Sequence, residues 1–275
     1  MKIIKLNGRL GNNLFHYALY IHLNKNAFFP IFLFGYDRGF QKYFEKISFF
    51  DNPLLRKVIN KIYKFLWQKF IFKQSDFQSN TDIAIGIQKN VFLDGYFQST
   101  CFFENSIELI KTKIKIKEKY VDKFQSKYGK TYSENKILAI HYRLGDYVNW
   151  GNESLGGKDM TLPISYFKNA LNEITDLESY KIHIISDEID KVKEKFCFLK
   201  SAYYFSENEI VDFQLLMHAH TLIISNSTFA WWAAFLSTNV KQVLAPEHFV
   251  GFKINKDFPE GIYKNSDFKI VKVYQ

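Results

Sequence analysis

The second half of the chain alternates short apolar runs with longer amphipathic stretches, and no other feature constrains the fold as strongly. The apolar runs predict four strands, over 136–143, 181–187, 221–226 and 241–246. The amphipathic stretches predict four helices, over 164–174, 188–196, 209–219 and 227–236. Strands that alternate with helices form parallel βαβ units, so this half should be a doubly wound α/β sheet. Ligands bind such sheets beyond the carboxyl ends of the strands.

The first half of the chain is less regular. It predicts a strand over 2–7, a glycine turn over 8–13, a helix over 13–26 and a strand over 91–97. The charged stretch 117–136 predicts a helix followed by a polar loop, and it is the best candidate for a domain boundary. We therefore expect two domains, 1–132 and 133–275.

The net charge of +9 over 275 residues raises the question of a nucleic-acid or membrane partner. The lysines are spread along the whole chain, acidic residues interrupt them, and no zinc-finger or RNP-type signature occurs. We expect a solvated basic surface and no nucleic acid as partner, and an anionic membrane surface stays open as an alternative.

The sequence predicts a cytoplasmic protein, because it has only two cysteines, no signal-peptide run and no apolar segment long enough to span a membrane. Peripheral contact at the inner face of the membrane stays open as an alternative.

Polar residues follow two of the predicted strands directly. In "HYRLGDY" (141–147), Arg143 can grip a diphosphate with its planar guanidinium, and the alternative is a surface ion pair between Arg143 and Asp146. In "SNSTFAWW", Ser227 or Thr228 lies at the start of a helix, where free N–H groups suit a phosphate. Simple N-capping is the alternative there. Two such strand ends suggest one shared site.

Other patterns give weaker signals. The glycine turn "GRLGNN" lacks the third glycine of a dinucleotide fingerprint, and "ESLGGKD" lacks both the first glycine and the hydroxyl residue of a P-loop. The sequence contains no Asp-x-Asp pair of the kind that holds a metal on a sugar nucleotide. His218 and His220 lie two residues apart on a predicted helix and are expected to be structural.

Five motifs in order along nearly the whole chain carry a resemblance: "GRLGNNLFHYAL", "GYFQSTCFF", "HYRLGDYV", "IISDE" and "SNSTFAWWAAFL". Together they resemble the bacterial α-1,2-fucosyltransferases of glycosyltransferase family 11. The resemblance implies an α/β, GT-B-like fold with two Rossmann-like domains facing a cleft. It makes 1–132 the acceptor-side domain and 133–275 the GDP-fucose-binding domain.

The resemblance also implies inverting transfer of L-fucose from GDP-fucose to the 2-hydroxyl of a terminal galactoside, in a surface glycan or its precursor. GDP-fucose is then a substrate, and neither a cofactor nor a metal is expected. The alternatives are a transferase for another GDP-sugar or another fucose linkage, and a non-catalytic basic protein that binds membrane or nucleic acid.

By the same resemblance, Arg143 would hold the β-phosphate of the leaving GDP, and Asp146 would order the loop or serve the acceptor. Asp212 would accept the N1–H and N2–H groups of guanine, a donor pair that suits a carboxylate. Asn12 is the expected first-domain contact and joins Arg143 and Asp146 as a catalytic candidate. The donor-binding candidates are His141, Arg143, Asp187, Asp212, Asn226, Ser227, Thr228 and Phe229.

Two positions depart from the family pattern. The family's second arginine is Leu144 here, and the first arginine, Arg143, should suffice. Asn13 replaces a family glutamine, which bears on the acceptor more than on the chemistry.

The stretch 54–73 has helical spacing and two interpretations. Its apolar positions are Leu55, Val58, Ile59, Ile62, Phe65 and Leu66, and its basic positions are Arg56, Lys57, Lys61 and Lys64. The favoured interpretation is a helix packed on the core with a basic outer face. The alternative is a helix on a membrane surface, useful if the acceptor is lipid-linked.

Overall fold

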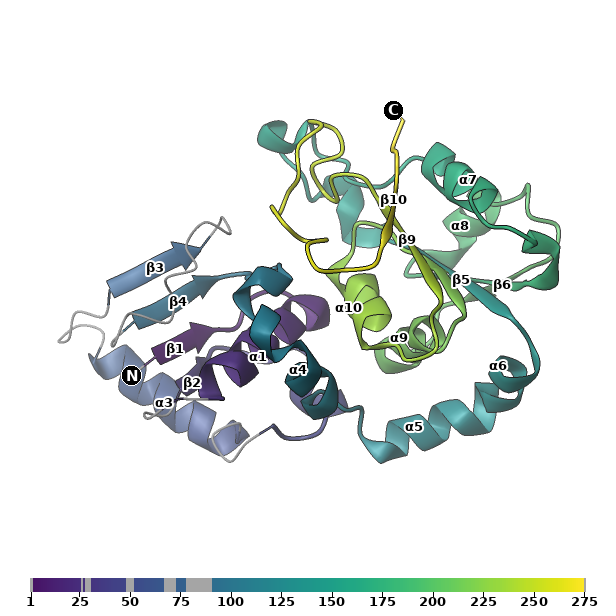
Figure 1. Cartoon of the computed structure of the whole chain (residues 1–275). Coiled ribbons are helices and arrows are strands. Elements are labelled where there is room, and N and C mark those ends of the chain that lie inside the picture. The colour runs from purple at the N-terminus through teal and green to yellow at the C-terminus, as the bar shows by residue number, and fades with distance from the viewer. Residues whose placement is uncertain are drawn as a thin grey trace. The chain divides into compact units, whose positions relative to one another are not determined.

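The structure, a computed structural model, describes residues 2–25, 27, 31–47, 52–66, 73–77 and 91–274. The chain divides into two compact units. The first comprises the residues up to Lys117 together with Glu260–Asn265, and the second comprises Glu118–Pro259 and Ser266–Gln275. Each unit has a parallel sheet of its own (Figure 1).

The sheet of the first unit has the strand order β2-β1-β4-β3, and all its pairs are parallel. Its strands are β1 (Lys2–Lys5), β2 (Ile31–Phe34), β3 (Lys73–Phe77) and β4 (Val91–Gly95). Its helices are α1 (Leu10–Asn24), α2 (Phe40–Tyr43), α3 (Pro53–Leu66) and α4 (Ile107–Lys113). The strands expected over 2–7 and 91–97 and the helix expected over 13–26 are therefore present.

The glycine turn between β1 and α1 depends on Gly8. Its φ is +72°, a conformation that favours glycine, and an added Cβ atom would collide with the Asn12 side chain. The turn thus brings Asn12 close under the backbone that leaves β1.

The sheet of the second unit has the order β10-β9-β8-β5-β6-β7, again with parallel pairs. Its strands are β5 (Ile137–Tyr142), β6 (Lys181–Ser186), β7 (Ala202–Phe205), β8 (Thr221–Ile223), β9 (Gln242–Pro246) and β10 (Lys269–Val271). The chain steps outward from β5 to β6 and β7, then returns to β8 beside β5 and steps outward to β9 and β10. This is the strand order of a Rossmann fold.

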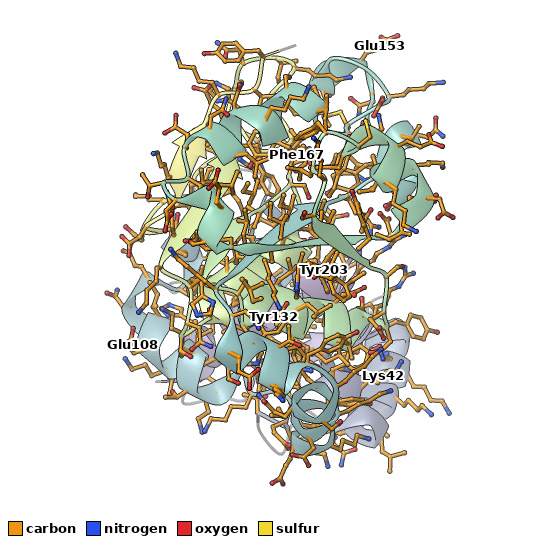
Figure 2. All side chains as sticks on the ribbon, turned by 90° about the vertical axis from the view of Figure 1, so that its right-hand side faces the viewer. Lys42, Glu108, Tyr132, Glu153, Phe167 and Tyr203 are labelled. Carbon is orange, nitrogen blue, oxygen red and sulfur yellow. The ribbon has the colours of Figure 1, made fainter. Side chains whose placement is uncertain are left out.

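Helices cover both faces of this sheet. They are α7 (Ile164–Asn172), α8 (Ile189–Lys195), α9 (Glu209–Met217) and α10 (Thr228–Leu236). Phe167 of α7 packs on Tyr142 and Phe196, whereas the Tyr132 ring packs on His183 of β6 from the other face. Figure 2 shows Phe167 and Tyr132 on opposite sides of the strands.

The second unit begins with a longer helical stretch than the sequence predicts. It consists of α5 (Glu118–Phe124), a π-helical turn (Gln125–Gly129) and α6 (Lys130–Glu134), so the expected polar loop is not formed. The Gln214 side chain of α9 donates a hydrogen bond to the Tyr120 carbonyl at 3.0 Å, and the Phe124 ring stacks on His218. These contacts attach the stretch to the second unit, and the predicted boundary at 132/133 falls inside it.

None of the helices in the described ranges combines the length and apolar character needed to cross a membrane.

Candidate functional site

The second sheet has a topological switch point between β5 and β8. These strands are neighbours, and the chain runs outward from them in opposite directions. In open α/β sheets the crevice beyond the carboxyl ends of such a strand pair is where ligands bind. The motif "HYRLGDY" lies at the end of β5, and the motif "SNSTFAWW" follows β8.

His141, near the end of β5, ties the two strand ends together. Its Nδ1 atom lies 2.7 Å from the Ser225 Oγ atom, which follows β8. The His141 side chain is buried, and burial, with the Arg143 charge adding to it, lowers its pKa to about 3. His141 is therefore a neutral imidazole at physiological pH. The predicted site residues do not include Ser225, although the stretch "IISNST", which indicated this strand end, contains it.

Arg143 is held by two carboxylates directly after β5. Its Nε atom donates a hydrogen bond to Asp146 Oδ1 at 3.1 Å, and its Nη2 atom donates to the same oxygen. Its Nη1 atom lies 3.0 Å from Asp187 Oδ2, after β6. The ion pair between Arg143 and Asp146 that the sequence raised as an alternative is thus present, and Asp187 completes it. A phosphate would have to use the N–H groups that face away from both carboxylates.

Asp187 and Leu144 help to fix the backbone around this arginine. The Leu144 N–H donates to Asp187 Oδ1 at 3.1 Å, so one carboxylate holds both the backbone and the guanidinium. The Leu144 side chain is buried and packs into the unit. The position of the family's second arginine is therefore a packing position in this chain.

The loop after β5 is tied to the end of β8 through Asn226. The Tyr147 hydroxyl donates to the Asn226 carbonyl at 2.9 Å, and the Asn226 Nδ2 atom donates to the Met160 carbonyl at 2.9 Å. The Tyr147 ring also lies under the guanidinium of Arg143, 5.8 Å from centroid to Cζ. Asn226 is fully buried, so it braces the loop from inside the unit.

The start of α10 completes this edge of the sheet. Ser227 is the N-cap residue, but its side chain makes no capping hydrogen bond, and Thr228 is the first helical residue. The helix therefore begins without the side-chain cap that the sequence raised as an alternative. The Phe229 ring lies between those of His141 and Phe213, with centroid distances of 5.9 and 5.3 Å.

Asp212 lies in the first turn of α9, next to Phe213. Its Oδ1 atom accepts the Glu207 N–H at 3.0 Å. Burial raises the pKa of Asp212 to about 7, although that hydrogen bond acts against the shift and the charges of Glu207 and Glu209 add to it. Its carboxyl group therefore titrates close to neutral pH, as perturbed groups at functional sites often do.

The first unit presents an amide pair at the carboxyl end of its own sheet. The Gln98 Nε2 atom donates to Asn12 Oδ1 at 2.8 Å, joining the turn after β1 to the segment after β4. Asn13, one residue on, is fully buried and receives the Arg38 N–H at 2.9 Å. Gln98 was not among the predicted residues, although the motif "GYFQST" contains it.

The two histidines of "HAH" have structural contacts. His220 Nδ1 accepts the Ile137 N–H at 3.1 Å, and His218 stacks on Phe124. Over the described ranges, no group of three or more His, Cys, Asp or Glu side chains is placed to hold a metal ion.

The sequence matches one family over most of its length. The model of glycosyl transferase family 11 covers residues 1–266. The chain belongs to this family. It is also 25% identical, over 190 residues, to the O-antigen biosynthesis glycosyltransferase WbnK of Escherichia coli, and the match spans 66% of this chain and 62% of WbnK.

Solved structures share the fold. The α-1,6-fucosyltransferase NodZ co-crystallized with GDP, an enzyme known from Bradyrhizobium, matches with a TM-score of 0.53 and 12% identity over 88% of this chain and 93% of its own. A mutant of Arabidopsis thaliana FUT1 in complex with GDP matches with a TM-score of 0.51 and 11% identity, over 89% of this chain and 69% of its own. The α/β, GT-B-like fold class expected for this family-11 chain is confirmed.

Proposed function

We propose that this family-11 chain is an inverting fucosyltransferase that moves L-fucose from GDP-fucose to the 2-hydroxyl of a terminal galactoside. The acceptor would be a surface glycan or its precursor, in keeping with the O-antigen relative. The second unit would bind the donor, and the first would serve the acceptor.

The observation that carries the proposal is that Arg143 and the start of α10 follow two neighbouring strands at the switch point. A guanidinium and the N-terminus of a helix both stabilise negative charge, and two adjacent strand ends bring them to one edge of the sheet. A sugar-nucleotide diphosphate is a ligand with the charge and position that such an edge fits.

The reaction places the largest change of charge at this edge. The bond between the anomeric carbon of fucose and the β-phosphate oxygen breaks, and its electron pair leaves with GDP. The acceptor oxygen bonds to the opposite face of the carbon and loses its proton to a base. Negative charge therefore grows on the β-phosphate, where Arg143 would stabilise it more in the transition state than in the ground state.

Asp212 would select guanine, since an ionised carboxylate can accept both N–H groups of the guanine edge. His141, Asn226, Ser227, Thr228 and Phe229 would line or brace the donor site. Asn12, together with Gln98, would contact donor or acceptor from the first unit.

The direct test is transfer with a matched pair of acceptors. The protein is incubated with GDP-fucose and β-galactosides, and the product linkage is determined by NMR. The control acceptor is the 2-deoxygalactoside, which lacks only the hydroxyl that should be fucosylated. We expect product with an α-1,2 linkage from the galactoside and none from the 2-deoxy compound.

Other outcomes would replace the proposal. Equal transfer to the 2-deoxy acceptor would indicate another linkage, and transfer from GDP-mannose instead of GDP-fucose would indicate another donor. GDP that fails to raise the melting temperature of the protein would indicate that the second unit does not bind this nucleotide at all.

A further inference from the structure

Helix α3 of the first unit packs beside β2 with an unusual orientation. It begins at Pro53, and the Asn52 side chain accepts the Leu54 N–H at 2.9 Å as an N-cap. Figure 1 shows α3 along the outside of the first unit's sheet. The described part of the helix allows its inward and outward faces to be distinguished.

Two described side chains on the inward face of α3 are polar. Arg56 is buried, its Nη2 atom donates to the Tyr17 hydroxyl at 2.7 Å, and its Nη1 atom lies 3.5 Å from Asp37. Asn60, one turn later, accepts the Gly35 N–H at 3.2 Å through its side-chain oxygen. Two polar side chains four residues apart therefore attach the helix to the unit.

The outward face of α3 carries an apolar stripe. Leu54, Val58 and Ile62 are 70%, 51% and 49% exposed, and their spacing of four residues aligns them in one stripe. This stripe lies on the side of the helix roughly opposite Arg56 and Asn60. The expectation of a core-packed apolar face with a basic outer face is wrong for Arg56, Val58 and Ile62, because a buried ion pair outweighs the apolar pattern here. The side chains of Ile59, Lys64, Phe65 and Leu66 lie outside the described residues.

We propose that this stripe, formed by Leu54, Val58 and Ile62, docks the protein on an anionic lipid surface. Lys57 and Lys61 are exposed and lie along one side of the stripe, so apolar and basic side chains face outward together. A helix that presents both lies in the plane of a membrane, with its apolar residues in the headgroup region and its lysines on anionic lipid.

The size of the stripe favours a membrane over a second copy of the chain. A stable dimer buries about 800 Å² on each partner. Three side chains along two helical turns supply only a small part of that area. Shallow insertion into a bilayer needs no matching protein surface, and the overall charge of +9 assists it.

Docking goes beyond the proposed transfer reaction and does not depend on it. Docking would bring the protein to an acceptor that is carried on a lipid.

The test is flotation of the full chain with vesicles of phosphatidylcholine alone or with phosphatidylglycerol, at low and at physiological salt. We expect binding to the anionic vesicles, weakened by salt. The affinity for anionic vesicles should fall about tenfold or more in the triple variant L54Q/V58Q/I62Q and in the double variant K57Q/K61Q. Glutamine keeps helix propensity, and circular dichroism checks the fold.

Two variants provide matched controls. I270Q/Y274Q removes apolar side chains that are 44% and 59% exposed in the second unit, and K130Q/K193Q removes the same charge as K57Q/K61Q. Both should bind vesicles like the wild type. Transfer to a soluble galactoside should persist in all four variants, so loss of docking and failure of the proposed reaction are separate results.

The proposal is overturned if the wild type ignores anionic vesicles, or if the α3 variants bind them as the controls do. A wild-type dimer in light scattering that becomes a monomer in L54Q/V58Q/I62Q, without vesicle binding, would assign the stripe to a second copy instead.

Discussion

At the scale of single residues, the arrangement around Arg143 is the most informative. Asp146 and Asp187 hold its guanidinium from two sides, and Asp187 also receives the Leu144 N–H. The family resemblance, through the motif "IISDE", placed Asp187 among the donor contacts. Its contacts favour a positioning role, which no sequence pattern distinguishes from binding. An arginine fixed before the donor arrives needs little reorganisation during reaction.

Asp187→Asn tests this positioning role. Asparagine can still accept the Leu144 N–H but loses the charge that holds Nη1 of Arg143. We expect kcat for fucose transfer to fall about tenfold while the KM for GDP-fucose changes much less. The control is Glu188→Gln, which removes the neighbouring charge from an exposed pair with Lys191 at 3.1 Å. Equal kcat values for the two variants would show that Asp187 does not position Arg143 for the reaction.

As the proposed guanine contact, Asp212 should make donor binding depend on pH. Its pKa, raised to about 7 by burial, leaves mostly the protonated form at pH 6, which lacks one of the two acceptors that guanine needs. Affinity for GDP-fucose should therefore rise by up to about tenfold from pH 6 to pH 8. Asp212→Asn should bind more weakly and show no such rise. Calorimetric titration with GDP-fucose in the absence of acceptor measures both, and parallel pH profiles would contradict the assignment.

The raised pKa of Asp212 also predicts that the stability of the fold falls as pH rises, whereas the affinity for the donor should increase. The folded-state pKa exceeds the unfolded value of 3.8, so folding loses stability as pH rises between these two values. Asp212→Asn should consequently melt at a higher temperature than the wild type at pH 8 and at a similar temperature at pH 4. A lower melting temperature at pH 8 would show that the ionised carboxylate stabilises the fold.

At the scale of elements, the bond between His141 and Ser225 joins the carboxyl ends of β5 and β8. Ser225→Ala removes the hydroxyl and leaves a buried imidazole nitrogen without this partner. We expect a loss of about 1–3 kcal/mol in the unfolding free energy of the second unit. Ser165→Ala is the control, because the Ser165 hydroxyl is exposed and bonds only a terminal carbonyl, that of Tyr274, among the described residues. Urea unfolding followed by tryptophan fluorescence compares them, and equal midpoints would contradict the prediction.

Elements with strong periodicity were predictable and edge strands were not. β5, β6, β8 and β9 lie in the interior of the second sheet, so their residues form apolar runs that the sequence displays. β7 and β10 are at the edges and are largely half-exposed or exposed, which removes that signal. The helix α3 had the right period, but its orientation depended on the buried contacts of Arg56 with residues distant in sequence.

At the scale of the whole molecule, the site was partly predictable because parallel strands collect their carboxyl ends at one edge. The motifs after β5 and β8 could therefore be expected to meet. Ser225, Tyr147 and Gln98 were missed, since their roles depend on side-chain contacts that spacing does not encode. The sequence thus indicated which strand ends meet, but it did not separate residues that would touch a donor from those that hold them.

Metal independence is the corresponding prediction for the complete enzyme. In the proposed mechanism, Arg143 and the N-terminus of α10 would together neutralise the leaving diphosphate, which a divalent cation does in other transferases. Fucose transfer should continue at an undiminished rate in EDTA. Loss of activity that magnesium or manganese restores would show that these two groups do not suffice.

The central claim is that Arg143 stabilises the charge that develops on the leaving GDP, and Arg143→Lys tests it most directly. Lysine keeps the charge but loses the planar two-point contact. The measurement is steady-state transfer of fucose beside calorimetric titration with GDP, with circular dichroism to verify the fold. We predict that kcat falls on the order of a hundredfold or more, while GDP binding weakens less. A correctly folded Arg143→Lys protein with near-normal kcat would contradict the account.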